Sequence, residues 1–411
     1  MMPSNDLPDN FKETEIGPIP VSWEVVPLGS LARVKYGKAK PKQEGIIPAM
    51  GSGGTYAWVN EALVDFPTLV IGRKGTAGRA WLMDKPCWPS DTTFYLEWTQ
   101  EVDIHFLFGY LTLNPLSGEH AKTTLPSLSR PDLENYLVPC PPLPEQRRIA
   151  HVLSTIQRAI AAQDGLIAAA REVKRSLMQR LFTYGPGPEP APTKETEIGE
   201  IPEHWEVVQL GDHIAEGPQN GLYKPLSLYG EGTPIIRIND YDTDGRFASL
   251  NFRRVRLEPA EIQKYLLREK DILVNRVNSL PQLGKSILVP TFPEPTVFES
   301  NMMRFAVDGI RLLPQYAILF LCSPQAHTQM VGKAKRAVAQ SSINQGDVKS
   351  LLVPLPPTSE QTTIVRMAAA TDRKIEAEEQ RKVALQSLFL SMLHQLMTGQ
   401  VRIPDIVEVL Q

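Results

Sequence analysis

The sequence has few of the residues that build disulfide frameworks or metal sites. It contains only three cysteines, Cys87, Cys140 and Cys322, which lie far apart in the chain. An odd number of widely spaced cysteines provides neither a disulfide framework nor a CxxC metal site. The seven histidines form no spaced cluster either. We therefore predict that the protein holds no metal.

Long apolar runs and a strong charge excess are also absent. No segment reaches the roughly 18 consecutive apolar residues of a membrane span. The N-terminal residues are acidic and polar, without the basic start and apolar core of a secretory signal. These features predict a cytoplasmic protein. The net charge of −3 gives no overall sign of nucleic-acid binding, but binding depends on local clusters of charge. Such basic clusters occur at residues 33–42, 73–79, 145–185, 253–256 and 333–336.

The strongest feature that is present is an internal repeat. Residues 13–29 return at 195–211 with an offset of 182, and residues 138–146 return at 353–361 with an offset of 215. Ordered matches of this kind indicate a duplicated unit. Because the offset grows from 182 to 215, the second copy holds about 33 extra residues in its globular part. Trp23 and Trp205 are equivalent. Their fixed place in a repeated strand predicts packing in the core and not stacking on a ligand.

Each copy has a globular part and then a long helix. The globular parts are rich in Gly, Pro and β-branched residues in short runs, which predict short strands joined by turns. A helix of about 40 residues follows each Pro-rich stop, with apolar residues at steps near three and four. The predicted fold class is α+β. The predicted segments are a globular domain 1–142, a helical arm 143–185, a Pro-rich extended linker 186–194, a second globular domain 195–356, a second arm 357–400 and a tail 401–411.

The two arms are longer than either domain needs for its own core, since a 40-residue helix rises about 60 Å. We expect them to pair with each other and act as a spacer. The alternative is that each helix packs across its own domain.

This organisation resembles the specificity subunits of type I restriction–modification systems over nearly the whole chain. The resemblance is carried by residues 23–29 with 205–211, by 142–146 with 357–361, and by the helix ends at Leu181 and Leu396. The second copy reads PPTSEQ where the first reads PPLPEQ, but Ser359 can still cap a helix. The resemblance implies two tandem mixed α/β target recognition domains, each reading one half of an asymmetric DNA site.

The same resemblance implies how the arms and the partners are arranged. The arms would pair as an antiparallel coiled coil with an internal pseudo-two-fold axis, set the distance between the half-sites and dock two adenine methyltransferase subunits. A restriction and translocation subunit would complete the enzyme in a prokaryotic cytoplasm. This chain would hold no cofactor: S-adenosylmethionine would bind the methyltransferase partner, and ATP and Mg the restriction partner. Two homologous domains in one chain also fit a bipartite, non-palindromic site with half-sites about one helical turn apart.

Candidate DNA contacts lie in Gly-rich, polar and basic segments. The turn at 72–79 combines close backbone approach with three cations, and its counterpart at 275–278 offers Arg and Asn donors suited to guanine and adenine edges. The predicted DNA-binding residues are Lys38, Lys40, Lys42, Arg73, Lys74, Thr76, Arg79, Lys122, Thr124, Ser127, Arg237, Asn275, Arg276, Asn278, Lys285, Lys333, Lys335, Arg336, Ser341 and Ser342. The predicted partner-docking residues are Glu145, Gln146, Glu360 and Gln361.

No catalytic residue is predicted. The segment 284–286 has the GKS of a phosphate-binding loop, but Ser279 stands where the motif needs Gly. Pro131-Asp132 with 172–174 imitates a nuclease pattern, yet Glu172 falls in the middle of an arm. The motifs of an amino-methyltransferase are missing. The alternatives that remain are a specificity subunit of a system whose methyltransferase and nuclease are fused, a scaffold that binds protein or carbohydrate, and a free-standing nuclease.

Overall fold

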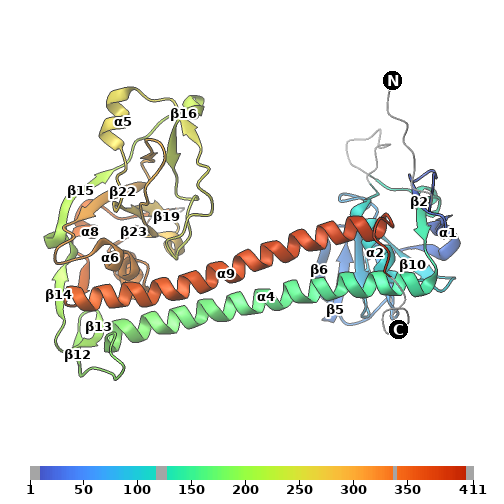
Figure 1. Cartoon of the computed structure of the whole chain (residues 1–411), viewed down its shortest axis with the longest axis horizontal. Helices are drawn as coiled ribbons and strands as arrows, with labels where there is room; N and C mark the ends of the chain where they lie inside the picture. Colours follow the sequence, from blue (N-terminus) through green and yellow to red (C-terminus); the bar gives the residue numbers. More distant parts are fainter. Residues whose placement is uncertain (1–9, 117–126, 337–339, 404–411) are drawn as a thin grey trace. The chain divides into compact units, whose positions relative to one another are not determined.

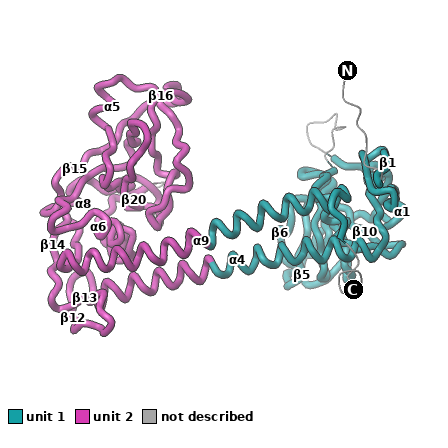
Figure 2. Tube along the Cα trace, in the orientation of Figure 1, with its two compact units in different colours: residues 1–166, 378–411 teal, residues 167–377 magenta. Residues whose placement is uncertain are grey.

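The chain folds into two compact units. The structure, a computed structural model, describes residues 10–116, 127–336 and 340–403 (Figure 1). Unit 1 comprises residues 1–166 and 378–411, and unit 2 comprises residues 167–377 (Figure 2). Each unit therefore contains one globular domain and one half of each long helix.

The globular part of unit 1 is built on a four-stranded antiparallel sheet. A smaller three-stranded sheet (β6-β5-β9) and two strand pairs (β1-β2 and β11-β3) surround it, and short helices cover its edges. The order of the large sheet is β4 (Ala32–Tyr36), β10 (Thr93–Trp98), β7 (Thr68–Gly72) and β8 (Ala80–Met83). The other elements are β1 (Phe11–Lys12), β2 (Ile19–Pro20), β3 (Glu24–Pro27), β5 (Glu44–Gly51), β6 (Gly54–Val59), β9 (Trp88–Pro89), β11 (Leu137–Cys140), α1 (Leu28–Leu31), α2 (Ile104–Leu113) and α3 (Arg130–Glu134).

Unit 2 repeats this plan with additions. Its four-stranded sheet has the order β15 (Ile214–Asn220), β22 (Met302–Val307), β18 (Ile272–Asn275) and β20 (Ser286–Leu288). The other strands are β12 (Thr193–Thr196), β13 (Gly199–Pro202), β14 (Glu206–Gln209), β16 (Tyr229–Ile236), β17 (Arg254–Val255), β19 (Val277–Asn278), β21 (Val297–Phe298), β23 (Lys335–Arg336), β24 (Ser341–Ser342) and β25 (Leu352–Leu355). Its helices are α5 (Pro259–Tyr265), α6 (Pro314–Leu321), α7 (Pro324–Lys333) and α8 (Gln345–Lys349), with short 3-10 turns at Leu210–His213, Leu226–Leu228 and Leu280–Gln282.

The repeated tryptophans lie in the two cores, as predicted. Trp23 is fully buried and its ring meets Phe106 edge-on at 6.2 Å. Trp205 has an exposed fraction of 1% and belongs to the main apolar cluster of unit 2. Neither indole face is open to a ligand.

The long helices are α4 (Leu143–Tyr184) and α9 (Thr358–Met397), and they run antiparallel within each unit. In unit 1, Gln163 donates from Nε2 to Glu378 Oε2 at 2.6 Å, and Leu153 lies in one cluster with Leu393. In unit 2, Lys174 Nζ lies 2.8 Å from Asp372 Oδ1. These contacts exclude the alternative in which each helix packs only on its own domain.

Each helix ends in the core of the unit that it enters last. The end of α4 brings Phe182 to within 6.0 Å of Tyr316 and 5.7 Å of Phe320, measured between ring centroids. The end of α9 places Leu396 and Met397 in the unit 1 core. Because these side chains are buried, both globular domains depend on apolar surface from the distant helix.

The Pro-rich linker is not the extended spacer that its composition predicted. Arg180 donates from Nη2 to Gly187 O at 3.3 Å and to Pro188 O at 3.1 Å, and Ala191 N donates to Tyr184 O at 3.1 Å. The linker therefore turns back onto the end of α4. Capping of backbone carbonyls by Arg180 outweighs the extended preference of proline.

Candidate DNA-recognition surface

Arg73 and Arg276 occupy equivalent places in the two domains. Each follows the central strand of its four-stranded sheet, β7 or β18. The backbone N–H of Arg73 donates to Thr92 O at 2.8 Å, and that of Arg276 donates to Asn301 O at 2.8 Å. The carbonyls of the two arginines accept equivalent bonds at 2.9 Å from the segment that precedes the helical arm. The correspondence predicted between 72–79 and 275–278 therefore has a geometric basis.

The two guanidinium groups are also held in the same way. Arg73 Nη1 lies 3.5 Å from Asp91 O, and Arg276 Nη1 lies 3.2 Å from Ser300 O. In unit 1 the guanidinium carbon also lies 5.0 Å from the centre of the Tyr36 ring, a cation–π contact. Each arginine keeps further donors for a ligand, because a guanidinium carries five N–H groups.

In the first domain, several predicted contacts gather around the loop 90–92. Lys38 pairs with Ser90 and Lys74 pairs with Ser127 in isolated bridges. The residues Lys40, Lys42, Thr76 and Arg79 are exposed, with Arg79 over the Trp81 ring at 4.2 Å. Lys122 and Thr124 fall outside the described residues.

In the second domain, a three-stranded sheet collects the polar candidates. Strand β24 lies between β19 and β23, so Asn278 pairs with Ser341, and Arg336 pairs with Ser341 on the other side. The sheet continues from Arg276, and Ile343 N bonds to the carbonyl of that arginine. Asn278, Lys335, Arg336 and Ser342 are at least partly exposed there, Ser341 is largely buried, and Lys333 is exposed at the end of α7.

Two predicted contacts lie in the interior and are wrong as surface residues. Asn275 is fully buried and donates from Nδ2 to Gln282 O at 3.4 Å. Lys285 has an exposed fraction of 9%, and its ammonium donates to Ile238 O. Burial lowers the pKa of Lys285 below its ordinary value. Asn275 was misplaced because all four residues of β18 are buried, so the strand gives no alternating pattern. Arg237 is half-buried and ion-paired with Glu299 at 3.3 Å.

The predicted docking residues of the first arm are buried inside unit 1. Glu145 accepts from Trp23 Nε1 at 3.1 Å and from Arg402 at 2.6 Å. Gln146 accepts from Asp103 N at 2.9 Å and donates to a proline carbonyl at 2.8 Å. These side chains therefore fasten the first domain to the start of α4, and their role as partner contacts stays a prediction.

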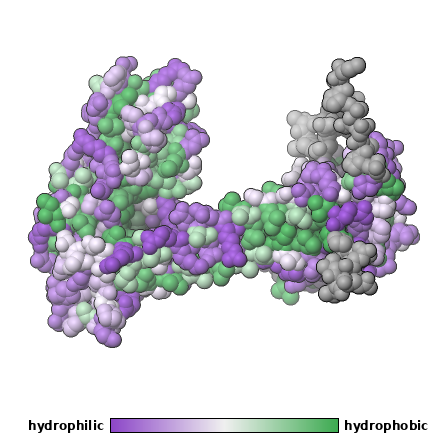
Figure 3. All heavy atoms as spheres, in the orientation of Figure 1, coloured by the Kyte–Doolittle hydropathy of each residue, from purple (hydrophilic) through white to green (hydrophobic). Residues whose placement is uncertain are grey.

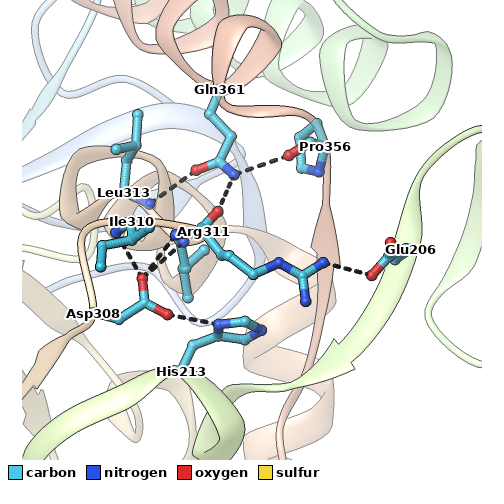
Figure 4. A network of polar contacts seen from close by, with 9 residues as sticks. Glu206, His213, Asp308, Ile310, Arg311, Leu313, Pro356 and Gln361 are labelled. Carbon is cyan, nitrogen blue, oxygen red and sulfur yellow. Dashed lines mark hydrogen bonds and ion pairs between the residues drawn. The ribbon is translucent and has the colours of Figure 1, made fainter.

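The same fastening recurs at the start of α9. Glu360 accepts from Trp205 Nε1 at 2.9 Å. Figure 4 shows Gln361 accepting from Leu313 N at 2.9 Å and donating to Pro356 O at 2.9 Å and Arg311 O at 2.7 Å. The repeated Glu-Gln pair thus bonds within the chain in both units, because it supplies groups that satisfy a buried indole N–H and loop backbone.

The loop that bonds to Gln361 is held by Asp308. Asp308 accepts from three backbone N–H groups and lies 2.8 Å from His213 Nδ1 (Figure 4). Partial burial acts to raise the pKa of Asp308, but these hydrogen bonds lower it below its ordinary value. The loop that receives Gln361 is therefore itself held rigidly.

Sequence reasoning missed an apolar surface on unit 1. Figure 3 shows hydrophobic surface over the C-terminal half of α9, where Val383, Leu388 and Leu390 have exposed fractions of 60%, 47% and 65%. A small groove beside it is lined by α2, α4 and α9, including Phe108 and Phe389. Large exposed apolar patches mark interaction sites more often than isolated apolar residues do.

Two further findings limit the chemistry of the described residues. No group of three or more His, Cys, Asp or Glu side chains in residues 10–116, 127–336 and 340–403 is arranged to hold a metal ion. None of the helices in the same part of the chain has both the length and the apolar composition that a membrane crossing needs.

Comparison with known proteins gives a consistent result. The family model described as the type I restriction modification DNA specificity domain matches residues 20–170 and 202–387. The MjaVIII specificity subunit of Methanocaldococcus jannaschii is 26% identical and covers 97% of each chain. The EcoKI specificity subunit of Escherichia coli is 28% identical over 64% of this chain and 56% of its own length.

The fold agrees with this relationship. The crystal structure of the S subunit of a type I restriction–modification system from M. genitalium aligns with a TM-score of 0.54 at 15% identity, over 99% of this chain and 100% of the other. The related proteins are named as specificity subunits, the non-catalytic components of their enzymes. The chain belongs to the family of type I restriction–modification DNA specificity domains, of which it carries two copies in tandem.

Proposed function

We propose that this chain reads a bipartite, asymmetric DNA site and directs adenine methyltransferase and restriction subunits to it. The observation that carries the proposal is the equivalence of Arg73 and Arg276 at the ends of matching central strands. Their neighbours differ, since Lys74 corresponds to Val277. Two domains with one scaffold but different side chains at the same surface suit two different half-sites, because base contacts set specificity.

The long helices would set the spacing of the half-sites. Each contributes its first half to one unit and its second half to the other, and 42 residues of α4 rise about 63 Å. We propose that they form an antiparallel coiled coil related by a pseudo-two-fold axis, with a spacer length that follows from helix length. Polar cross-links such as Lys382 to Asp164, at 2.5 Å, would fix their register.

The partner surface would be the apolar face of α9 in unit 1. Val383 and Leu390 are seven residues apart and share one face of the helix; in the helical repeat they correspond to Ala168 and Arg175, so the matching face of unit 2 is less apolar. A methyltransferase subunit burying Val383 and Leu390 would gain about 25 cal/mol for each Å² of apolar surface removed from water. The chemistry would come from the partners, which would hold S-adenosylmethionine, ATP and Mg; this chain would act without a cofactor, in the cytoplasm.

The test is a domain exchange followed by mapping of modified adenines. Residues 13–142 are replaced by the corresponding domain of another specificity subunit, and the complete complex is expressed in cells that lack other adenine methylation. Only one half of the methylated motif should change. A change in both halves would contradict the two-module proposal, and an absence of any methylated motif with the unaltered chain would refute the function itself.

Binding to DNA should also weaken steeply with salt. A complex that neutralises several phosphates loses orders of magnitude in affinity as salt rises, whereas a carbohydrate-binding scaffold does not. DNA cleavage by the chain alone with magnesium would instead support a free-standing nuclease.

A further inference from the structure

A hollow of about 440 Å³ opens on the first domain beside Arg73. It is lined by residues 51–56, from the turn between β5 and β6, and by residues 90–92. Arg73 Nη1 lies 3.5 Å from Asp91 O, and the indole of Trp81 donates to Ser52 O at 3.3 Å. The hollow is therefore continuous with the turn that carries the predicted DNA contacts.

The lining of this hollow is rich in hydrogen-bond acceptors. Asp91 is exposed, and an ionised carboxylate accepts hydrogen bonds without donating any. The hydroxyls of Ser90 and Thr92 lie 2.7 Å apart and satisfy one another. None of the lining residues is Lys or Arg. The exposed carboxylate of Asp91 suits a neutral group that donates a hydrogen bond.

Glycines let such a group approach closely. Gly53 is exposed and has no heavy atom within 4 Å of where a side chain would begin. Gly54 is buried, with a φ of +112° and the Trp81 ring 3.2 Å from where a side chain would begin, so it shapes the turn and does not open the hollow. The turn therefore exposes backbone at the rim of the hollow.

The residues at the equivalent place in the second domain are different. Two parallel strand pairings are equivalent, that of Met50 with Pro89 in the first domain and that of Ile236 with Phe298 in the second. Arg237 therefore stands where the first domain has Gly51. Arg237 fills that place with an ion pair to Glu299. The counterpart of Asp91 is Ser300, because both supply the carbonyl that receives an arginine Nη1. The two domains thus differ here in charge and in open volume.

We propose that this hollow reads a base of the first half-site, with Asp91 accepting a hydrogen bond from the exocyclic amino group of adenine or cytosine. These two bases present an amino donor in the major groove, whereas guanine and thymine present acceptors there. The assignment rests on the proposed DNA-reading function and adds to it the class of base and the residue that selects it.

The test compares three variants in the complete methyltransferase complex. Asp91→Asn and Asp91→Ala change the exposed carboxylate, and Ser300→Ala changes the matching position of the second domain. Binding is measured to duplexes in which each position of the first half-site carries all four base pairs. Asp91→Ala should reduce the preference for an amino-bearing base at one position about tenfold, consistent with loss of one directional base contact. Asp91→Asn keeps an amide oxygen as an acceptor but loses the charge, so it should reduce the same preference by less than Asp91→Ala does. Ser300→Ala should leave that position unchanged.

Three results would overturn the inference. One is that both Asp91 variants keep the base preference of the unaltered chain. Another is that they lose binding affinity equally for every DNA sequence. The third is an equal effect of Ser300→Ala on the first half-site. Unfolding midpoints equal to that of the unaltered chain exclude misfolding as the cause. If the unaltered complex shows no bipartite specificity, the proposed function fails; if it does and Asp91 is indifferent, only this inference fails.

Discussion

Removal of the Glu145 carboxylate should destabilise unit 1 by about 2–3 kcal/mol. In Glu145→Ala the Trp23 N–H loses its only acceptor in the described structure while it stays buried, which costs about 1–3 kcal/mol. The ion pair with Arg402 is also lost, but that guanidinium is 41% exposed, so screening limits its worth to about 0.5 kcal/mol. The sum is a large fraction of the stability of an ordinary domain.

Two comparisons make this prediction specific. Glu145→Gln keeps an amide oxygen for the indole and should cost only about 1 kcal/mol. Glu101→Ala removes an exposed ion pair with Arg147 and should cost less than about 0.5 kcal/mol. Calorimetric unfolding of the full chain should show the unit 1 transition falling by about 4–12 °C in Glu145→Ala. Equal midpoints for Glu145→Ala and Glu101→Ala would refute the role assigned to the carboxylate.

Three further outcomes are expected. Arg73→Ala should relax recognition in the first half-site only and Arg276→Ala in the second only, each by about 1–3 kcal/mol in binding assays; a loss shared by both halves would contradict their assignment. Leu390→Glu should weaken assembly with the methyltransferase subunit in size-exclusion titrations, whereas Ser391→Glu, which adds the same charge about 100° further round the helix, should not. Deleting one heptad from each long helix should shorten the spacer of the methylated motif and leave both half-sites readable; an unchanged spacer would rule out the helices as its determinant.

The sequence alone predicted those features that depend on local pattern. The repeat, the two long helices and the core position of both tryptophans follow from periodicity and from matched segments. The partners of the repeated Glu-Gln pair did not, because Trp23 and Glu145 are 122 residues apart. A conspicuous polar motif at the start of a helix was therefore assigned to an external partner, although its hydrogen bonds close within the chain.

The location of the extra residues in the second copy also needed the structure. The sequence shows how many residues were added but not where they lie. Gly37 and Gly221 occupy equivalent places, since the backbone N–H of each donates to the neighbouring strand of its sheet. Gly72 and Asn275 are equivalent as well, because they precede the matched residues Arg73 and Arg276. The offset rises from 184 to 203 between these points. Much of the insertion therefore lies ahead of the central strand, around β16, β17 and α5. Loops of that kind carry too little periodicity for alignment by pattern.

The composition of unit 1 from both ends of the chain has a consequence for how the protein is made. Residues up to 166 leave the ribosome first, yet their core stays incomplete until Leu393, Leu396 and Met397 have been synthesised. At about 5–20 residues per second this wait lasts on the order of 10–50 s, while unit 2 is contiguous and can close sooner. The domain that begins translation is thus the last to mature, and a premature stop near residue 390 would damage it although its own codons are intact.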